Sequence, residues 1–277
     1  RLNDGRESVL IVMKMKGFRQ IPVLDEYDCV VSVEFLDELI QLQKRENWVV
    51  LMAGGIGKRL QPLTHECPKP LIHVGKKPIL ETILENFIEY GFQHFFISVN
   101  YKAEMVEDYF GNGSRWGVEI RYLREDKGMG TAGPLGFLPH IPLLPILVMN
   151  GDLLTKVNFR QLLDFHEEHQ AQATICVREY HIQIPYGVVN IDRHRLIDIE
   201  EKPVKNVFVN AGIYVLEPKA LELVPKNSYL DMPDLFKKII AQGFETAAFP
   251  IREYWLDIGR MDDLERAKGD YAEVFEC

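Results

Sequence analysis

The chain has 277 residues, 47% of them hydrophobic and 26% charged, which is ordinary for a globular protein with one large α/β domain and a small addition, or with two domains. The net charge of −9 argues against nucleic acid as a partner, although a local group of cations can still bind a small anion. No CxxC pair, signal peptide or apolar run of membrane-spanning length is evident, so we expect a cytoplasmic protein without a zinc site, a disulfide framework or a membrane partner.

Residues 1–46 and 47–277 follow different patterns, and we predict a domain boundary between them. The first segment predicts two short strands and two helices, in the order helix 8–16, strand 20–24, strand 29–33, helix 34–42. So small an α+β unit cannot bury much core, and we expect it to pack on something else. Because the chain starts at Arg1 within what reads as an element, we also expect N-terminal sequence to be missing.

From Trp48 onward the pattern is one of strands alternating with helices. The apolar run 48–52 ends in glycines, as expected for a buried parallel strand. The next predicted elements are helix 78–90, strand 95–99, helix 103–110, strand 118–123, helix 132–137 and strand 146–149. This alternation predicts a Rossmann-like, doubly wound, mostly parallel sheet that binds ligands at the carboxyl ends of its strands.

The second half of the chain is richer in strands. We predict strands over 173–177, 188–191, 196–199 and 207–215, and helices over 233–242 and 261–271.

The strongest chemical signal is a glycine-rich segment directly after the first buried strand. Gly54, Gly55 and Gly57 would let the backbone amides approach an anion closely, and Arg59 and Lys69 add positive charge. The segment is neither a Walker A loop nor a dinucleotide-binding GxGxxG motif. It therefore predicts a site for phosphate groups of another kind.

This segment, GGxGxRLxPLT followed by PKPL, resembles the signature of nucleoside-diphosphate-sugar pyrophosphorylases, a family of nucleotidyltransferases that includes mannose-1-phosphate guanylyltransferase. The likeness extends from Trp48 to about Tyr271. It implies a GT-A-like nucleotidyltransferase core that joins a nucleoside monophosphate to a sugar 1-phosphate. It also implies that Ala53 and the three glycines bind the nucleotide, and that Arg59 and Lys69 are catalytic.

Two further aspartates complete the implied catalytic group. Asp152 follows the predicted strand 146–149, and a carboxylate in this place suits Mg²⁺, which prefers one or two carboxylates together with substrate phosphates. The element Tyr254-Trp-Leu-Asp-Ile-Gly resembles the family's second metal-binding motif. The resemblance therefore implies that Asp152 and Asp257 hold Mg²⁺ between them.

Other segments resemble the substrate-binding motifs of the family. The segment from Glu125 to Leu135 is similar to the base-binding GTAG segment, which assigns Gly128, Gly130 and Thr131 to the nucleotide. Three short motifs resemble the pocket for the sugar phosphate and assign to it Tyr186, Gly187, Glu201, Lys202, Asn210 and Gly212. The resemblance favours GTP slightly and leaves dTTP, UTP and CTP open.

The N-terminal segment has a likeness of its own, since residues 13–39 resemble the last half of a cystathionine-β-synthase (CBS) module. Such modules usually occur in pairs and bind adenine nucleotides. A partial module favours a packing or dimerisation role, and it is our candidate contact should the chain form homo-oligomers. Such an attachment also suggests a specialised surface-polysaccharide pathway, with a hexose or amino-hexose 1-phosphate as the acceptor. Two alternatives remain at this point, a catalytically inactive nucleotide sensor and an enzyme with another small phosphate acceptor.

Overall fold

The computed structural model describes residues 9, 12–13, 15–25, 27–35 and 44–275, and the chain divides into two compact units, Arg1–Arg45 and Glu46–Cys277. The smaller unit contains an antiparallel hairpin of β1 (Gln20–Leu24) and β2 (Val30–Phe35). The Asp25 carboxylate orders the turn between the strands by accepting the amide hydrogens of Tyr27 and Cys29, both at 2.9 Å.

The predicted first strand of this unit is confirmed, whereas the second runs further than predicted. The run Val-Val-Ser-Val-Glu-Phe stays extended because Glu34 and Phe35, like the two residues before them, pair with β1, so the helix predicted from residue 34 cannot begin there. The remainder of that helix, 36–42, lies outside the described residues. The described members of the predicted helix 8–16 are helical.

The larger unit is built on a seven-stranded sheet with the order β14-β10-β13-β8-β3-β6-β7. The pairs β3–β8, β6–β7 and β10–β14 are parallel, and β13 is antiparallel to both of its neighbours. The predicted mostly parallel α/β sheet is therefore confirmed. The strands are β3 (Arg45–Met52), β6 (Phe92–Val99), β7 (Glu119–Arg124), β8 (Ile146–Asn150), β10 (Ala173–Gln183), β13 (Val204–Leu216) and β14 (Thr246–Ile251).

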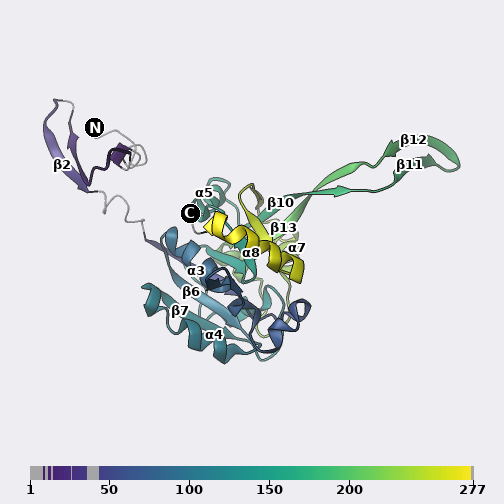
Figure 1. Cartoon of the computed structure of the whole chain (residues 1–277), viewed down its shortest axis with the longest axis horizontal. Coiled ribbons are helices and arrows are strands. Elements are labelled where there is room, and N and C mark those ends of the chain that lie inside the picture. The colour runs from purple at the N-terminus through teal and green to yellow at the C-terminus, as the bar shows by residue number, and fades with distance from the viewer. Residues whose placement is uncertain (1–8, 10–11, 14, 26, 36–43, 276–277) are drawn as a thin grey trace. The chain divides into compact units, whose positions relative to one another are not determined.

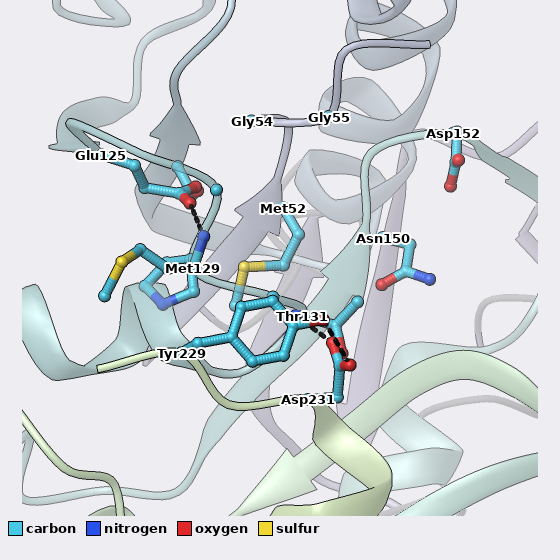
Figure 2. Close-up of a pocket in the computed structure, with 14 residues that line it drawn as sticks. Met52, Gly54, Gly55, Glu125, Met129, Thr131, Asn150, Asp152, Tyr229 and Asp231 are labelled. Carbon is cyan, nitrogen blue, oxygen red and sulfur yellow. Dashed lines mark hydrogen bonds between the residues drawn. The ribbon is translucent and has the colours of Figure 1, made fainter. Parts of the chain in front are cut away.

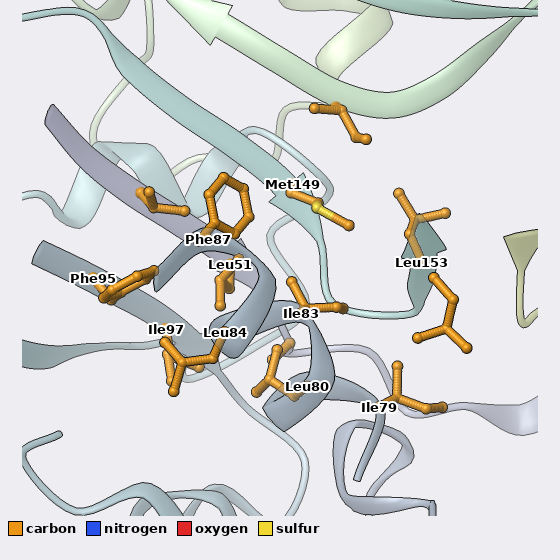
Figure 3. Packing of buried hydrophobic residues seen from close by; sticks show 14 of the residues in the cluster. Leu51, Ile79, Leu80, Ile83, Leu84, Phe87, Phe95, Ile97, Met149 and Leu153 are labelled. Carbon is orange, nitrogen blue, oxygen red and sulfur yellow. The ribbon is translucent and has the colours of Figure 1, made fainter. Parts of the chain in front are cut away.

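Helices cover both faces of this sheet and enclose two hydrophobic clusters. On one face, α3 places Ile83, Leu84 and Phe87 against Leu51 and Met149 of the central strands (Figure 3). The other face is covered mainly by α7 and the turn η5. The helices and 3-10 turns are η1 (Lys58–Leu60), η2 (Leu63–His65), η3 (Lys69–Leu71), α3 (Ile79–Glu89), α4 (Ala103–Phe110), η4 (Ser114–Trp116), η5 (Gly133–Phe137), α5 (Phe159–Glu168), α6 (Pro218–Leu221), α7 (Met232–Ala241) and α8 (Met261–Phe275). Among the described residues, no helix is both long and apolar enough to cross a membrane.

Two sequence predictions about these elements need correction. The predicted helix 132–137 is the 3-10 turn η5, because Pro134 and two glycines disfavour a regular α-helix. The sequence pattern also missed α5, where the Asn158 side chain caps the first turn by accepting the amides of Arg160 and Gln161, both at 3.1 Å.

Short sheets attach further segments to the core. β9 (Leu153–Thr155) pairs antiparallel with β15 (Trp255–Asp257), and β4 (His73–Val74) pairs with β5 (Lys77–Pro78). The strands β10 and β13 run beyond the body of the unit and continue into the hairpin of β11 (Gly187–Asp192) and β12 (Arg195–Glu201), which projects as a long arm (Figure 1). The β9–β15 pair borders the functional site.

Candidate active site

A pocket of about 360 Å³ opens where β3 and β8 end (Figure 2). This is the edge of a parallel sheet at which ligands usually bind. Its lining comes from five separate segments of the chain. The lining residues are Met52, Gly54, Gly55, Ser98, Glu125, Gly128, Met129, Gly130, Thr131, Pro134, Asn150, Asp152, Tyr229 and Asp231.

The glycine segment forms one wall of this pocket. Gly54 and Gly55 line it, and a Cβ atom on Gly54 would meet the Glu125 carboxylate, so a larger residue there would have to displace that side chain. Ala53 is buried just behind them, and its amide donates to the carbonyl of Ser98 at 3.0 Å. Gly57 lies outside the lining and serves the turn itself, since it has φ 69° at the start of η1.

The catalytic aspartates implied by the resemblance lie next to each other. Leu153 and Asp257 are paired between β9 and β15, and the amide of Ile258 donates to the carbonyl of Asp152 at 3.0 Å. Loss of hydration raises the pKa of Asp257, and the nearby carboxylate of Asp152 raises it further, against the opposing charges of Lys69 and Arg59. The two acids therefore belong to one electrostatic site.

Both predicted cations are part of this site. The Lys69 ammonium, whose side chain is nearly buried, is ion-paired with the Asp152 carboxylate. The Arg59 guanidinium lies beside Gly259, 3.4 Å from where a Cβ atom of that glycine would stand, and it acts electrostatically on Asp257. Neither cation lines the pocket itself, so both reach the site from its margin.

The two carboxylates fit a magnesium ion that completes its coordination with substrate oxygens. Mg²⁺ is commonly held by one or two protein carboxylates together with phosphates and water. The described residues contain no group of three or more His, Cys, Asp or Glu side chains that could hold a metal. A metal between Asp152 and Asp257 would therefore depend on a bound phosphate for further ligands.

The predicted base-binding turn is held in place by the loop before α7. The carboxylate of Asp231 accepts the amide of Thr131 at 3.0 Å and its hydroxyl at 3.3 Å, and the hydroxyl oxygen of Thr131 accepts the amide of Met232 at 2.8 Å. Tyr229 donates its hydroxyl to Asp231 at 2.7 Å and presents its ring to the pocket (Figure 2). This places Gly128, Gly130 and Thr131 in the lining, as predicted.

Glu125 is a pocket residue that the sequence analysis did not single out. Its side chain accepts hydrogen bonds from the Ser98 hydroxyl and, at 3.0 Å, from the amide of Met129. Burial raises the pKa of Glu125, and these two donors oppose the shift. The only sequence signal was its position at the start of the base-binding segment.

Tyr229 and Asp231 were also missed by the sequence analysis. They follow an unremarkable turn and precede a helix, and nothing in their local sequence indicates that the loop reaches the pocket.

The residues assigned to the sugar divide into two groups. Asn210 and Gly212 lie on the part of β13 that is close to the pocket, and a Cβ atom on Gly212 would stand 2.7 Å from the side-chain nitrogen of Asn150. Outside the pocket lining, and at the root of the arm, are Tyr186, Gly187, Glu201 and Lys202. The structure does not bring these four residues to the pocket, because β10 and β13 carry the arm past the edge of the sheet.

Comparison with known proteins identifies the family of this chain. Residues 48–274 match the nucleotidyl transferase family model. The chain is 32% identical over 79% of its length to a UTP–glucose-1-phosphate uridylyltransferase of Synechocystis sp., of which it covers 61%. It is 34% identical over 78% of its length to the mannose-1-phosphate guanylyltransferase catalytic subunit beta of Drosophila pseudoobscura pseudoobscura, of which it covers 60%. The chain thus spans about 60% of the length of these relatives.

A solved structure shows the same fold. HddC from Yersinia pseudotuberculosis, complexed with GMP-PN, aligns with a TM-score of 0.62 at 23% identity, over 81% of this chain and 99% of that one. The chain belongs to the nucleotidyl transferase family.

Proposed function

We propose that this chain transfers a nucleoside monophosphate from a nucleoside triphosphate to a sugar 1-phosphate and releases pyrophosphate. One observation carries the proposal: Asp152 and Asp257 lie together, with Lys69 and Arg59, beside a glycine-lined pocket. Glycine-segment amides and cations suit the triphosphate, and the paired acids suit the Mg²⁺ that accompanies it.

The proposed reaction is an in-line displacement at the α-phosphorus. A phosphate oxygen of the sugar 1-phosphate attacks, the new P–O bond forms, and the bond to the leaving pyrophosphate breaks. The attacking phosphate is already ionised at neutral pH, so the site needs no general base and acts by positioning and by neutralising charge. Arg59 and the amides at Gly54 and Gly55 stabilise the leaving group. Mg²⁺, when bound, supplies further charge neutralisation at the phosphates.

Lys69 has a second role in this proposal. Its ion pair with Asp152 holds that carboxylate in place and leaves positive charge near the reacting phosphates. Lys202, which the sequence assigns to the sugar phosphate, lies at the root of the arm and would act only with the arm in a different position relative to the pocket.

A sugar 1-phosphate, whose ring carries hydroxyl groups, suits the edge of the pocket near β13. The side-chain oxygen of Asn150 is buried, and it has no hydrogen-bond partner among the described residues. A buried hydrogen-bond acceptor without a donor destabilises the folded state, and a sugar hydroxyl would supply the donor. Gly212 lies directly against this side chain and leaves room for the ring. The names of the relatives also support a hexose 1-phosphate.

The pocket also supports a preference for GTP. The Glu125 carboxylate faces the pocket and, when ionised, is purely an acceptor. Guanine presents two adjacent donors, the ring N1–H and the exocyclic amino group, whereas uracil and thymine present one N–H between two acceptors. An acceptor at this position therefore complements guanine best. We expect the reaction to take place in the cytoplasm and to supply activated hexoses for surface polysaccharide synthesis.

The test is pyrophosphate release from each of the four nucleoside triphosphates and dTTP with a panel of sugar 1-phosphates, with Mg²⁺ and with excess EDTA. We expect release that depends on both substrates and on the metal, with a nucleotide sugar identified by mass. Release with phosphocholine but with no sugar phosphate would contradict the assigned acceptor. Nucleotide binding without release in any combination would favour the inactive sensor instead.

A further inference from the structure

The arm formed by β11 and β12 is a ribbon with two open edges. Within the described part of the chain these strands pair only with each other. They join β10 and β13 through a bend at Lys202, whose φ is 49°. Natural edge strands are usually protected against pairing by charges, bulges or covering elements. This ribbon reaches well beyond the body of the unit (Figure 1), so its exposure needs an explanation.

One face of the ribbon is apolar. The register pairs Val189 with Ile199 and Ile191 with Leu196, and a register shift between the two pairs leaves Ile197 unpaired. Val189 and Ile191 alternate along β11 and therefore point to one face, which their cross-strand partners share. These four side chains are 51 to 68% exposed. The neighbouring pair, Asn190 and Asp198, lies on the opposite face, which is polar. The other apolar residues of the hairpin are Val188, which pairs with Glu200 on the polar face, and Ile197, which is unpaired where the register shifts. A ribbon with four exposed apolar side chains together on one face presents that face for burial against another surface.

The charges along the arm indicate what that surface is. The tip carries Arg193 and Arg195 beside a single acid, Asp192, whereas the root carries mostly acids. The root residues are Glu200, Glu201 and Lys202, and a further acid, Asp198, lies midway along β12. Two arms lying antiparallel about a two-fold axis would therefore place each basic tip beside the acidic root of the other, as their apolar faces meet.

We propose that the apolar face of the arm binds the same face of a second copy of this chain, so that the protein is a homodimer joined through its arms. Each copy contributes an identical surface, as a two-fold contact requires. The contact would also fix the arm root, where Tyr186, Gly187 and Glu201 lie. On the basis of the proposed function, dimerisation would then set the position of the residues assigned to the sugar phosphate.

The decisive comparison uses two adjacent residues of β11. Val189→Asp places a charge on the apolar face, and Asn190→Asp places the same charge at the next position on the polar face. Sedimentation velocity of the full chain over a wide concentration range should show a dimer for the parent chain and for Asn190→Asp. Val189→Asp should be shifted to monomer, with the dissociation constant raised at least about tenfold. Circular dichroism and thermal melting check that both variants fold.

A measurement without variants guards against a folding defect. Hydrogen exchange of the unmodified chain should show arm amides that become protected as protein concentration rises and the dimer fills. The proposal would be overturned if the parent chain were monomeric at every concentration. It would also be overturned if Val189→Asp and Asn190→Asp dimerised equally well, or if hydrogen exchange in the arm did not depend on protein concentration. Monomer recruited to lipid vesicles through the arm would overturn it as well. None of these outcomes depends on pyrophosphate release, so the failure of the proposed function would be seen separately.

Discussion

Asp152 and Asp257, distant in sequence, are neighbours because the amide of Ile258 donates to the carbonyl of Asp152 and Leu153 pairs with Asp257. The two carboxyl groups have different environments. Asp152 is ion-paired with Lys69, whereas loss of hydration and the neighbouring Asp152 carboxylate raise the pKa of Asp257. The Asp152 carboxylate is thus held by an ion pair within the protein, whereas a bound cation would stabilise the negative charge of Asp257.

This difference predicts opposite effects on stability for two variants that both lose activity. Asp152→Asn and Asp257→Asn should each lower kcat by about a hundredfold or more, because both weaken the hold on Mg²⁺. Asp152→Asn should lower Tm, since it leaves the Lys69 ammonium nearly buried without its partner. Asp257→Asn should leave Tm unchanged or raise it, since it removes a carboxylate that the folded state disfavours.

Pyrophosphate release and thermal melting measure the two effects. Asp234→Asn, on the exposed surface of α7, provides the control for loss of a carboxylate elsewhere. Near-normal kcat in either active-site variant would show that the acid pair is not catalytic.

Gly212 should be required for the shape of the site. It has φ 72°, and an added Cβ would stand 2.7 Å from the Asn150 side-chain nitrogen and 2.9 Å from Leu153 Cδ1. Gly243 has φ 73° but no atoms within 4 Å of its Cβ position. Gly243→Ala should cost about 1 kcal/mol for the backbone conformation alone. Gly212→Ala should cost about 1 to 3 kcal/mol more, because Asn150 and Leu153 must move.

Urea denaturation of the two glycine variants gives the difference directly. Equal losses of stability would mean that the neighbours of Gly212 give way freely. Pyrophosphate release should fall only in Gly212→Ala, since Gly243 lies far from the site in the fold, after α7.

The sequence predicted the parts of this site that are local. Trp48 to Met52 is continuous apolar sequence followed by glycines, so both the buried strand and the turn after it could be recognised. The α4 bounds also agree with the prediction, because the sequence there has a helical apolar spacing and a glycine at its end. Features encoded by residues that are neighbours in the sequence could therefore be predicted from it.

The parts of the site that depend on contacts between distant segments could not be predicted from the sequence. Glu125 belongs to the pocket because Ser98 and the amide of Met129 hold its carboxylate there, and neither contact follows from a sequence period. Asp231 reaches Thr131 only because the loop before α7 folds across the sheet. The motifs around Tyr186 and Glu201 predicted a compact pocket, but motif order does not determine how far a pair of strands extends.

Glu125→Gln should change the preference among nucleotides. The amide keeps the size of the side chain but presents a donor and an acceptor instead of two acceptors, so it loses complementarity to the two donors of guanine. We expect kcat/KM for GTP to fall about 10- to 100-fold relative to that for UTP or dTTP, with little loss for the latter two. Asp126→Asn makes the same chemical change at the adjacent, exposed position and should leave the ratio unchanged. A uniform loss with all nucleotides would assign Glu125 to the architecture of the pocket instead.

His166 should make stability depend on pH between about 4 and 6.5. Its side chain is 1% exposed, and its ring nitrogens contact the Thr174 hydroxyl at 2.8 Å and the Glu217 carboxylate at 3.3 Å. Burial lowers its pKa from 6.5 to about 4. The unfolded chain therefore takes up a proton first as pH falls. The contribution of neutral His166 to stability is complete above pH 6.5 and is lost progressively toward pH 4, by up to about 3 kcal/mol.

Urea unfolding at a series of pH values measures this slope. His166→Asn removes the titrating ring and should flatten the curve between pH 4 and 6.5, at the cost of lower stability at neutral pH from the lost packing. Glu217 acts in the opposite direction, because burial raises the pKa of its carboxyl group and so favours the folded state at low pH. Glu217→Gln should therefore steepen the dependence that His166 causes. A slope that is unchanged in His166→Asn would locate the titrating group elsewhere, whereas a slope lost in both variants would mean that the two side chains titrate as one coupled pair.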